Sequence, residues 1–262
     1  MRKFPRHIVV WMNYHGVLKM VSTAVLVLMI GFIFSYELPS TKTWTYWTMP
    51  LSGKVIALDA GHGGPDGGAE SSPKGIIEKD VNLAISLYLR DYLQQAGALV
   101  VMTREQDNDL ASPDTKGLSR RKTEDLQKRV EFIRKQKSDL MISIHLNSYP
   151  SSKWSGAQTF FYPSHKDNFT LANLIQNELK HNLENTDRVS KQVDTVFLLK
   201  SLQIPAALVE VGFLSNPEES RLMAQEGYQK KVAASIYQGI LRYYSGEKSE
   251  GKSDAVGSGQ KG

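Results

Sequence analysis

The 262-residue chain contains no cysteine, and this absence sets the first limits on what it can be. No disulfide can stabilise the fold, and any metal site must take its ligands from histidine, aspartate and glutamate. A basic surface is also missing. Five of the 32 Lys and Arg residues, but only one of the 27 acidic residues, lie in residues 1–44, so the rest of the chain is close to neutral. No basic stripe interleaved with aromatic residues follows, and we therefore expect no nucleic-acid partner.

The longest uncharged run lies near the N-terminus, where Met20–Tyr36 reads MVSTAVLVLMIGFIFSY. As a helix this run would span roughly 26 Å, close to the hydrocarbon thickness of a bilayer, and Val17 and Leu18 extend it if Lys19 reaches the headgroups. Basic residues precede the run and Glu37 follows it, which predicts a cytoplasmic basic end and an exported remainder. A cleaved signal segment is the first alternative, although small residues are lacking at the cleavage positions. A buried core helix is the second.

The composition predicts four parts of the chain. Residues 1–36 form the basic end with its membrane anchor or signal segment, and residues 37–52, which mix Pro, Ser and Thr with aromatic residues, form a linker. Residues 53–245 alternate strand-like and helix-like patterns and form one folded domain. Residues 246–262 are rich in Gly, Ser and Lys without apolar periodicity, which predicts a disordered tail.

The folded part alternates short apolar runs with segments of helical periodicity. The apolar runs predict strands at residues 54–59, 98–103, 140–145, 157–162, 193–199 and 206–210. Helical spacing predicts helices at residues 81–95, 126–136, 169–183 and 217–244, the last with a break near Gly227. This alternation predicts an α/β domain with a mostly parallel twisted sheet flanked by helices on both faces. Ligand sites in such sheets lie at the carboxyl ends of the strands.

Two histidines lie at the ends of predicted strands. His62 belongs to the glycine-rich segment DAGHGG after the first strand, and His145 closes the strand at residues 140–145. The glycine-rich loop lacks the Gly-Lys-Ser/Thr ending and the GxGxxG spacing of phosphate-binding loops. One histidine after an apolar strand is more often structural than a ligand. Two histidines at the carboxyl ends of parallel strands indicate a shared site.

Two glutamates occupy comparable positions. Glu78 lies at the start of a predicted helix, where a carboxylate also suits the helix dipole, and Glu210 closes a buried strand, where it must be paired, hydrated or functional. Two histidines and one carboxylate form a three-ligand metal site that leaves the fourth position for water, and a second carboxylate can then serve as general base. The residue pattern alone does not say which glutamate is the ligand.

Four segments carry a family resemblance. In order, VIALDAGHGGPDGG, IIEKDVNL, ISIHLNS and PAALVEVGFLSNPEE resemble the hallmark segments of the zinc-dependent N-acetylmuramoyl-L-alanine amidases, and the similarity spans roughly residues 53–244. The resemblance implies Zn²⁺ held by His62, Glu78 and His145, with Glu210 as the catalytic glutamate. It also implies a hydrolase that cleaves the amide bond between N-acetylmuramic acid and L-alanine in peptidoglycan stem peptides.

The spare architecture, with one anchor and one catalytic domain, resembles the germination-specific amidases of spore-forming bacteria. That resemblance implies a role in spore-cortex maturation, where removal of the peptide precedes formation of muramic-δ-lactam. We therefore expect an extracytoplasmic protein, membrane-anchored or secreted, around the forespore, with peptidoglycan as substrate and an activator protein as a further partner. Two other hypotheses are an inactive peptidoglycan-binding domain and a scaffold that requires a partner.

Overall fold

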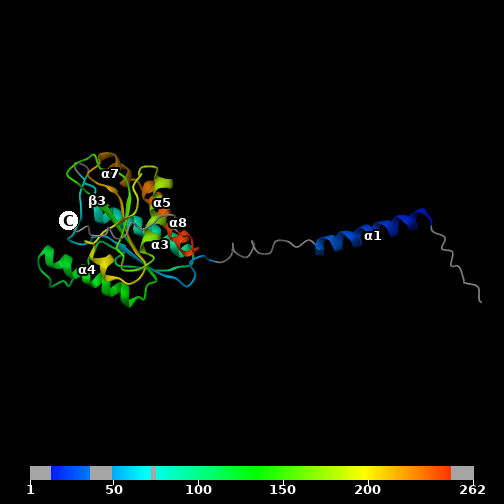
Figure 1. Ribbon diagram of the computed structural model, residues 1–262, viewed down its shortest axis with the longest axis horizontal. Helices are drawn as coiled ribbons and strands as arrows, with labels where there is room; N and C mark the ends of the chain where they lie inside the picture. The colour runs from blue at the N-terminus through cyan, green and yellow to red at the C-terminus, as the bar shows by residue number, and fades with distance from the viewer. Residues whose placement is uncertain (1–12, 36–48, 72–74, 249–262) are drawn as a thin grey trace, which may run out of the picture. The chain divides into compact units, whose positions relative to one another are not determined.

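The computed structural model describes residues 13–35, 49–71 and 75–248, and these residues belong to two compact units. One unit lies within residues 1–48 and the other within residues 49–262 (Figure 1). Most of the predicted linker and most of the predicted disordered tail fall outside the described residues.

The first unit is the helix α1 (Tyr14–Ser35). It begins where the side-chain Oδ1 of Asn13 accepts a hydrogen bond from the backbone N–H of Gly16 at 2.8 Å, which satisfies a donor that a helix start leaves free. Residues Tyr14–Phe32 are long and apolar enough to cross a membrane by length and composition, and none of their side chains is buried.

The second unit is built on a six-stranded sheet with the strand order β2-β1-β3-β6-β4-β5. Four neighbouring strands are parallel, and the last two run in the opposite direction to them. The strands are β1 (Val55–Ala60), β2 (Leu99–Met102), β3 (Leu140–Asn147), β4 (Gln158–Phe161), β5 (Lys191–Gln192) and β6 (Ala206–Phe213). The mostly parallel sheet predicted from the sequence is confirmed.

Helices cover both faces of this sheet, as predicted. One face packs against α3 (Glu78–Gln95), α5 (Asn168–Leu183) and α8 (Glu226–Tyr244), and the other against α4 (Leu118–Lys135) and α6 (Phe197–Ser201). In Figure 1, α4 stands apart from the group of α3, α5 and α8. The helices α5 and α8 pack closely at Gly239, where an added Cβ would lie 2.6 Å from the Cα of Ile175.

Two predicted elements differ from the structure, and the predicted break in the last helix is present. The strand predicted at residues 193–199 is wrong, because the chain forms the two-residue β5 and then the helix α6, which buries Leu198 and Leu199. A short apolar run does not distinguish a buried strand from a buried helical turn. The helix predicted from residue 126 begins at Leu118, since its first turns carry exposed charged residues and no apolar stripe. The predicted break in the last helix separates α7 (Pro217–Met223) from α8.

Candidate active site

The glycine-rich loop after β1 places His62 at the carboxyl edge of the sheet. His62 has a φ of 62°, a left-handed conformation that is uncommon for a residue with a side chain. The preceding Gly61 is required by close packing, because a Cβ there would lie 2.3 Å from Cε1 of His145. Nδ1 of His62 lies 2.9 Å from Oδ2 of Asp66, which orients the ring and directs Nε2 toward the centre of the site.

Glu78 is the first residue of α3, and it is almost fully buried, at 3% exposure. Its Oε2 accepts a hydrogen bond from the backbone N–H of Ala69 at 2.8 Å, and its Oε1 accepts one from the N–H of Leu146 at 3.0 Å. Burial raises the pKa of this carboxyl, but hydrogen bonds from His145 and His62 outweigh burial and hold the pKa below its ordinary value. Glu78 is therefore an anion at neutral pH.

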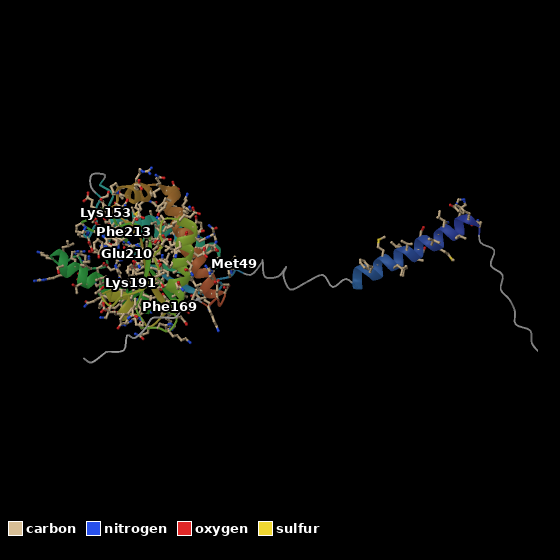
Figure 2. All side chains as sticks on the ribbon, turned by 45° about the horizontal axis from the view of Figure 1, so that its top comes forward. Met49, Lys153, Phe169, Lys191, Glu210 and Phe213 are labelled. Atoms are coloured by element: carbon tan, nitrogen blue, oxygen red, sulfur yellow. The ribbon has the colours of Figure 1, made fainter. Side chains whose placement is uncertain are left out.

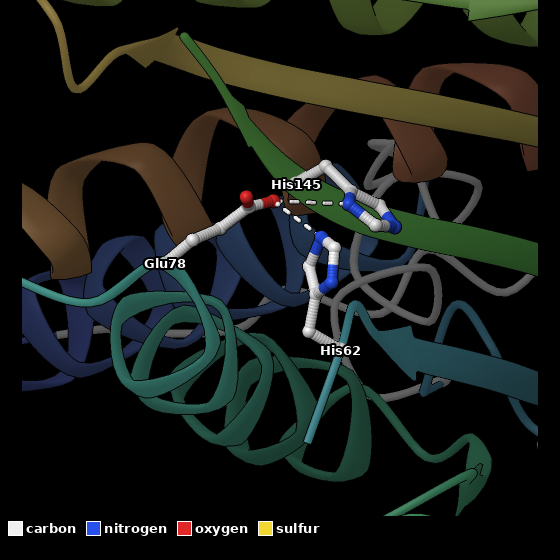
Figure 3. A group of neighbouring side chains, drawn as sticks. All are labelled: His62, Glu78 and His145. Atoms are coloured by element: carbon white, nitrogen blue, oxygen red, sulfur yellow. Dashed lines mark hydrogen bonds and ion pairs between the residues drawn. The ribbon is translucent and has the colours of Figure 1, made fainter. Parts of the chain in front are cut away.

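His145 on β3 completes a group of three converging side chains (Figure 3). Oε1 of Glu78 lies 3.0 Å from Nδ1 of His145 and 3.1 Å from Nε2 of His62. One ligand atom from each residue falls within 4.8 Å of the others, and this is the group of acidic and histidine side chains suited to a metal ion among the residues that the structure describes.

The donor set fits a zinc ion. Two imidazole nitrogens and one carboxylate oxygen form a catalytic zinc site with three protein ligands and an open fourth position. The separations of 3.0 and 3.1 Å are close to the roughly 3.3 Å that tetrahedral zinc with bonds of about 2.0 Å sets between its ligand atoms. The outer partners, Asp66 on His62 and the backbone N–H groups on Glu78, orient the ligands as metal sites require.

Glu210, which Figure 2 labels within the folded unit, is next to His145 on the neighbouring strand but is not part of this group. It is the register partner of His145 on the neighbouring parallel strand β6, and its Oε2 is buried without a hydrogen-bond partner among the described residues. Burial raises the pKa of Glu210 to about 7; nearby His145 lowers it and Glu78 raises it further. A buried, unpartnered carboxyl that titrates near neutrality is suited to accept and return a proton.

A buried arginine supports the loop that carries His62. Arg129 on α4 is 2% exposed, and its guanidinium donates to Oδ1 of Asp59 at 2.7 Å, to Oδ2 of Asp125 at 2.8 Å and to the backbone carbonyl of His62 at 2.6 Å. Burial raises the pKa of Asp59, but the charge of Arg129 and a hydrogen bond from Ser143 outweigh it and lower the pKa to about 2. The buried pair thus ties α4 to β1 and to the unusual backbone at His62.

A second arginine holds the same loop from the other side. Arg104, which follows β2, donates to the carbonyls of Ala60 and Gly61 at 2.9 Å each and to the carbonyl of Lys79 at 2.7 Å. These bonds join the histidine loop to the first turn of α3, which carries Glu78. The two elements that position His62 and Glu78 are therefore fixed to each other through one side chain.

The site opens into a recess of about 350 Å³ between the sheet and the helices α4 and α6. Its polar end holds His62, His145 and Glu210, and its wall is formed by apolar side chains of α4, α6 and the segment before α6. Lys122, half-exposed at this recess, lies 3.2 Å from Oδ2 of Asp66. A substrate can thus place a polar reacting group beside the three converging side chains and an apolar group against the wall.

All four residues singled out in the sequence lie at this one edge of the sheet, with Glu210 next to the other three. Sequence reasoning did not assign roles to Asp59, Arg104 or Arg129. Arg104 follows a predicted strand, and Asp59 lies inside a buried one, where an unpaired carboxylate is costly. A cationic partner for Asp59 could therefore have been predicted from the sequence.

Comparison with known proteins agrees with this geometry. Residues 56–242 match the family N-acetylmuramoyl-L-alanine amidase, Amidase_3. The chain is 53% identical over 214 residues to the germination-specific N-acetylmuramoyl-L-alanine amidase of Bacillus subtilis, which covers 82% of this chain and 90% of that protein. The structure resembles the CwlD amidase of Clostridioides difficile, solved in complex with the GerS lipoprotein, with a TM-score of 0.72 and 43% identity over 73% of this chain and 98% of that one.

A third relative is the catalytic domain of CwlV, an N-acetylmuramoyl-L-alanine amidase of Bacillus (Paenibacillus) polymyxa, with a TM-score of 0.63 and 31% identity over 73% of this chain and 98% of that domain. The fold and site define a peptidoglycan hydrolase. The chain belongs to the N-acetylmuramoyl-L-alanine amidase family, and within it the chain is similar to a germination-specific member.

Proposed function

We propose that this amidase is a zinc enzyme in which His62, Glu78 and His145 hold the metal and Glu210 is the catalytic residue. The observation that carries the proposal is the convergence of three suitable ligand atoms within 4.8 Å beside a buried carboxyl without a partner. Bound zinc supplies Lewis-acid polarisation of the scissile carbonyl.

The side chains of this chain then account for the proton movements. Glu210 accepts a proton from the attacking water and donates it to the nitrogen of the departing L-alanine, so that a neutral amine leaves. The surroundings of Glu78 lower its pKa, whereas burial raises the pKa of Glu210 to about 7, and this difference separates the roles of the two glutamates. Asp66 keeps the proton of His62 on Nδ1 and leaves Nε2 as a lone-pair donor.

Metal content tests the ligand set. The purified chain is expected to carry about one zinc, and His62→Ala or His145→Ala is expected to lose it after mild chelation, because two remaining ligands hold zinc weakly. His181→Ala, an exposed histidine on α5, is the matched control and is expected to keep its zinc. Full zinc occupancy in both site variants would exclude these ligands.

Glutamine variants of Glu78 and Glu210 test the separate roles proposed for the two glutamates. Glu210→Gln is expected to keep zinc and fold while losing roughly 10²–10⁴ in turnover, the usual contribution of general acid–base catalysis. Glu78→Gln is expected to be zinc-poor and to recover part of its activity in excess metal. Exchanged phenotypes would exchange the roles, and near-normal turnover by Glu210→Gln would reject the mechanism.

The bond that is cleaved distinguishes this enzyme from a binding module or scaffold. Mass spectrometry of peptidoglycan digested by the full chain is expected to show free stem peptides that begin with L-alanine and glycan with unsubstituted lactyl groups. A protein that binds peptidoglycan without releasing peptide would be an inactive module. Turnover only after addition of a partner would favour the scaffold hypothesis.

We further propose that the product serves cortex maturation, in which peptide-free muramic acid is converted to muramic-δ-lactam. The similarity to a germination-specific amidase supports this role. The proposal is tested by deleting the gene in a spore former and measuring lactam in the cortex. Cortex with normal lactam content would refute it.

The same relatives support a proposal for the location and the partner of the protein. We propose that residues 1–36 hold residues 53–245, the catalytic domain, outside the membrane that surrounds the forespore, and that a lipoprotein activates it. The apolar helix α1 and the relative solved with a lipoprotein support these proposals. External protease is expected to remove the domain from intact protoplasts; protection until lysis would reverse the orientation.

A further inference from the structure

Arg188 makes no direct ion pair among the described residues, although its charge acts on the nearby carboxyl of Glu219. Its Nε donates to the carbonyl of Ser155 at 3.0 Å, and its Nη1 donates to Oε1 of Gln158 at 3.2 Å. The guanidinium carbon lies 5.1 Å from the ring centre of Phe213 and 5.6 Å from that of Trp154. Within the described part of the chain, Arg188 forms no ion pair and its Nη2 has no hydrogen-bond acceptor.

The strand register places Arg188 near Glu210. Gln158 on β4 is the direct partner of Glu210 on the antiparallel strand β6. Side chains of directly paired residues point to the same face, with Cβ atoms about 4.5–5.5 Å apart. Since Nη1 of Arg188 bonds to Oε1 of Gln158, the guanidinium lies beside the side chain that pairs with Glu210 across β4 and β6.

The guanidinium is held in place before any ligand binds. Two hydrogen bonds and two aromatic rings fix the side chain, so a further hydrogen bond costs little conformational entropy. Arg188 also borders a surface hollow of about 440 Å³. The hollow is lined by Ser155, Lys180, Glu184, Asn185, Thr186, Asp187 and Arg188.

We propose that Arg188 binds a carboxylate of the stem peptide and thereby selects substrates, an inference that rests on the proposed amidase function. An unpaired, oriented guanidinium is the group that proteins use for carboxylates. Two or three residues of extended peptide span roughly 7–11 Å, which matches a path across about two strand spacings of about 4.8 Å. The ligand is therefore a free carboxylate on the second or third residue of the peptide.

Substrate pairs test this subsite with the full chain loaded with zinc. Three muramoyl tripeptides are compared: one with free carboxylates, one amidated at the second residue and one amidated at the third. We expect one of the two amidations to lower kcat/KM by roughly tenfold or more, through KM, because a charge-assisted hydrogen bond is lost. Arg188→Gln is expected to abolish that preference, and Arg188→Lys to keep part of it.

Arg221→Gln is the matched control, because Arg221 is an exposed arginine on α7 without an ion pair among the described residues. It is expected to keep the wild-type preference. Equal losses on all three substrates in Arg188→Gln, or an unchanged preference, would overturn the proposal and assign Arg188 a structural role or a place in a protein interface.

A binding measurement separates this inference from the proposed function. Calorimetry with the Glu210→Gln chain and the free and amidated tripeptides reports affinity without turnover. Weaker binding of the amidated peptide, lost when Arg188→Gln is added, supports the carboxylate subsite even if the wild-type chain hydrolyses no muramoyl peptide. Equal affinity for free and amidated peptides would reject the subsite.

Discussion

Replacing Arg129 by methionine removes the cation from the buried cluster beneath the histidine loop. Methionine fills a similar volume but leaves Asp59 and Asp125 without their charged partner. It also leaves the carbonyl of His62 without the Arg129 donor and removes one of the two arginine donors to the carbonyl of Ala60. Removing one partner of a buried ion pair costs about 3–5 kcal/mol, because the remaining charge stays in a site of low polarity. For a folded unit of this size, that loss lowers Tm by roughly 10 °C.

The assay has two readouts. Urea unfolding gives the change in the free energy of unfolding, and competition with a chromogenic chelator gives the zinc affinity. We expect both to fall in Arg129→Met, because the bond that holds the left-handed backbone at His62 is lost. Arg120→Met, an exposed change on the same helix, is the control. A loss below about 1 kcal/mol with unchanged zinc affinity would refute the reasoning.

Three further predictions concern acid, packing and ligand placement. The pKa of Asp59 lies at about 2 instead of 3.8, so its ionised form adds about 2 kcal/mol to the free energy of unfolding above pH 4. This stabilisation is lost as the pH falls toward 2. In Asp59→Asn, the urea midpoint is expected to depend less on pH over this range. Gly239→Ala is expected to destabilise the fold by about 1–3 kcal/mol, because the added methyl group meets the backbone of α5. Gly227 faces open space, so the control Gly227→Ala is expected to leave thermal stability unchanged or raise it. Gly61→Ala is expected to displace the His145 ring and lower zinc affinity at least tenfold. Wild-type affinity in a chelator titration would show that the loop at residue 61 moves and the His145 ring stays in place.

The reactive residues were predictable because each follows or closes an apolar run. His62 follows β1, which is buried except at Val55, and His145 lies in β3 directly after five buried residues. The rule for carboxyl ends of parallel strands therefore placed the two histidines together. The roles of Glu78 and Glu210 were not predictable from the pattern. They differ in hydrogen bonding, since Glu78 accepts bonds from two elements and Glu210 has an oxygen with no partner, and this is a property of the folded chain.

The buried contacts of Arg129 were not predictable from the sequence for a different reason. Arg129 lies on a helix rich in charged residues, where most arginines are solvated, and its partner Asp59 is 70 residues away in sequence. Apart from Asp125 one turn earlier and Thr103, its other contacts are to backbone carbonyls, which every residue has and no side-chain pattern records. The short helix α6 was mistaken for a strand because four or five apolar residues satisfy either structure when one face is buried.

The position of β6 determines when during synthesis the enzyme can first act. Among the described residues it is the last strand in the sequence, yet it lies in the middle of the sheet between β3 and β4, and it carries Glu210. A nascent or truncated chain that ends before Ala206 contains both histidines and Glu78 but lacks Glu210 and has a gap in its sheet. Because Glu210 is the proposed catalytic residue, a chain that ends before β6 is expected to hydrolyse no peptidoglycan.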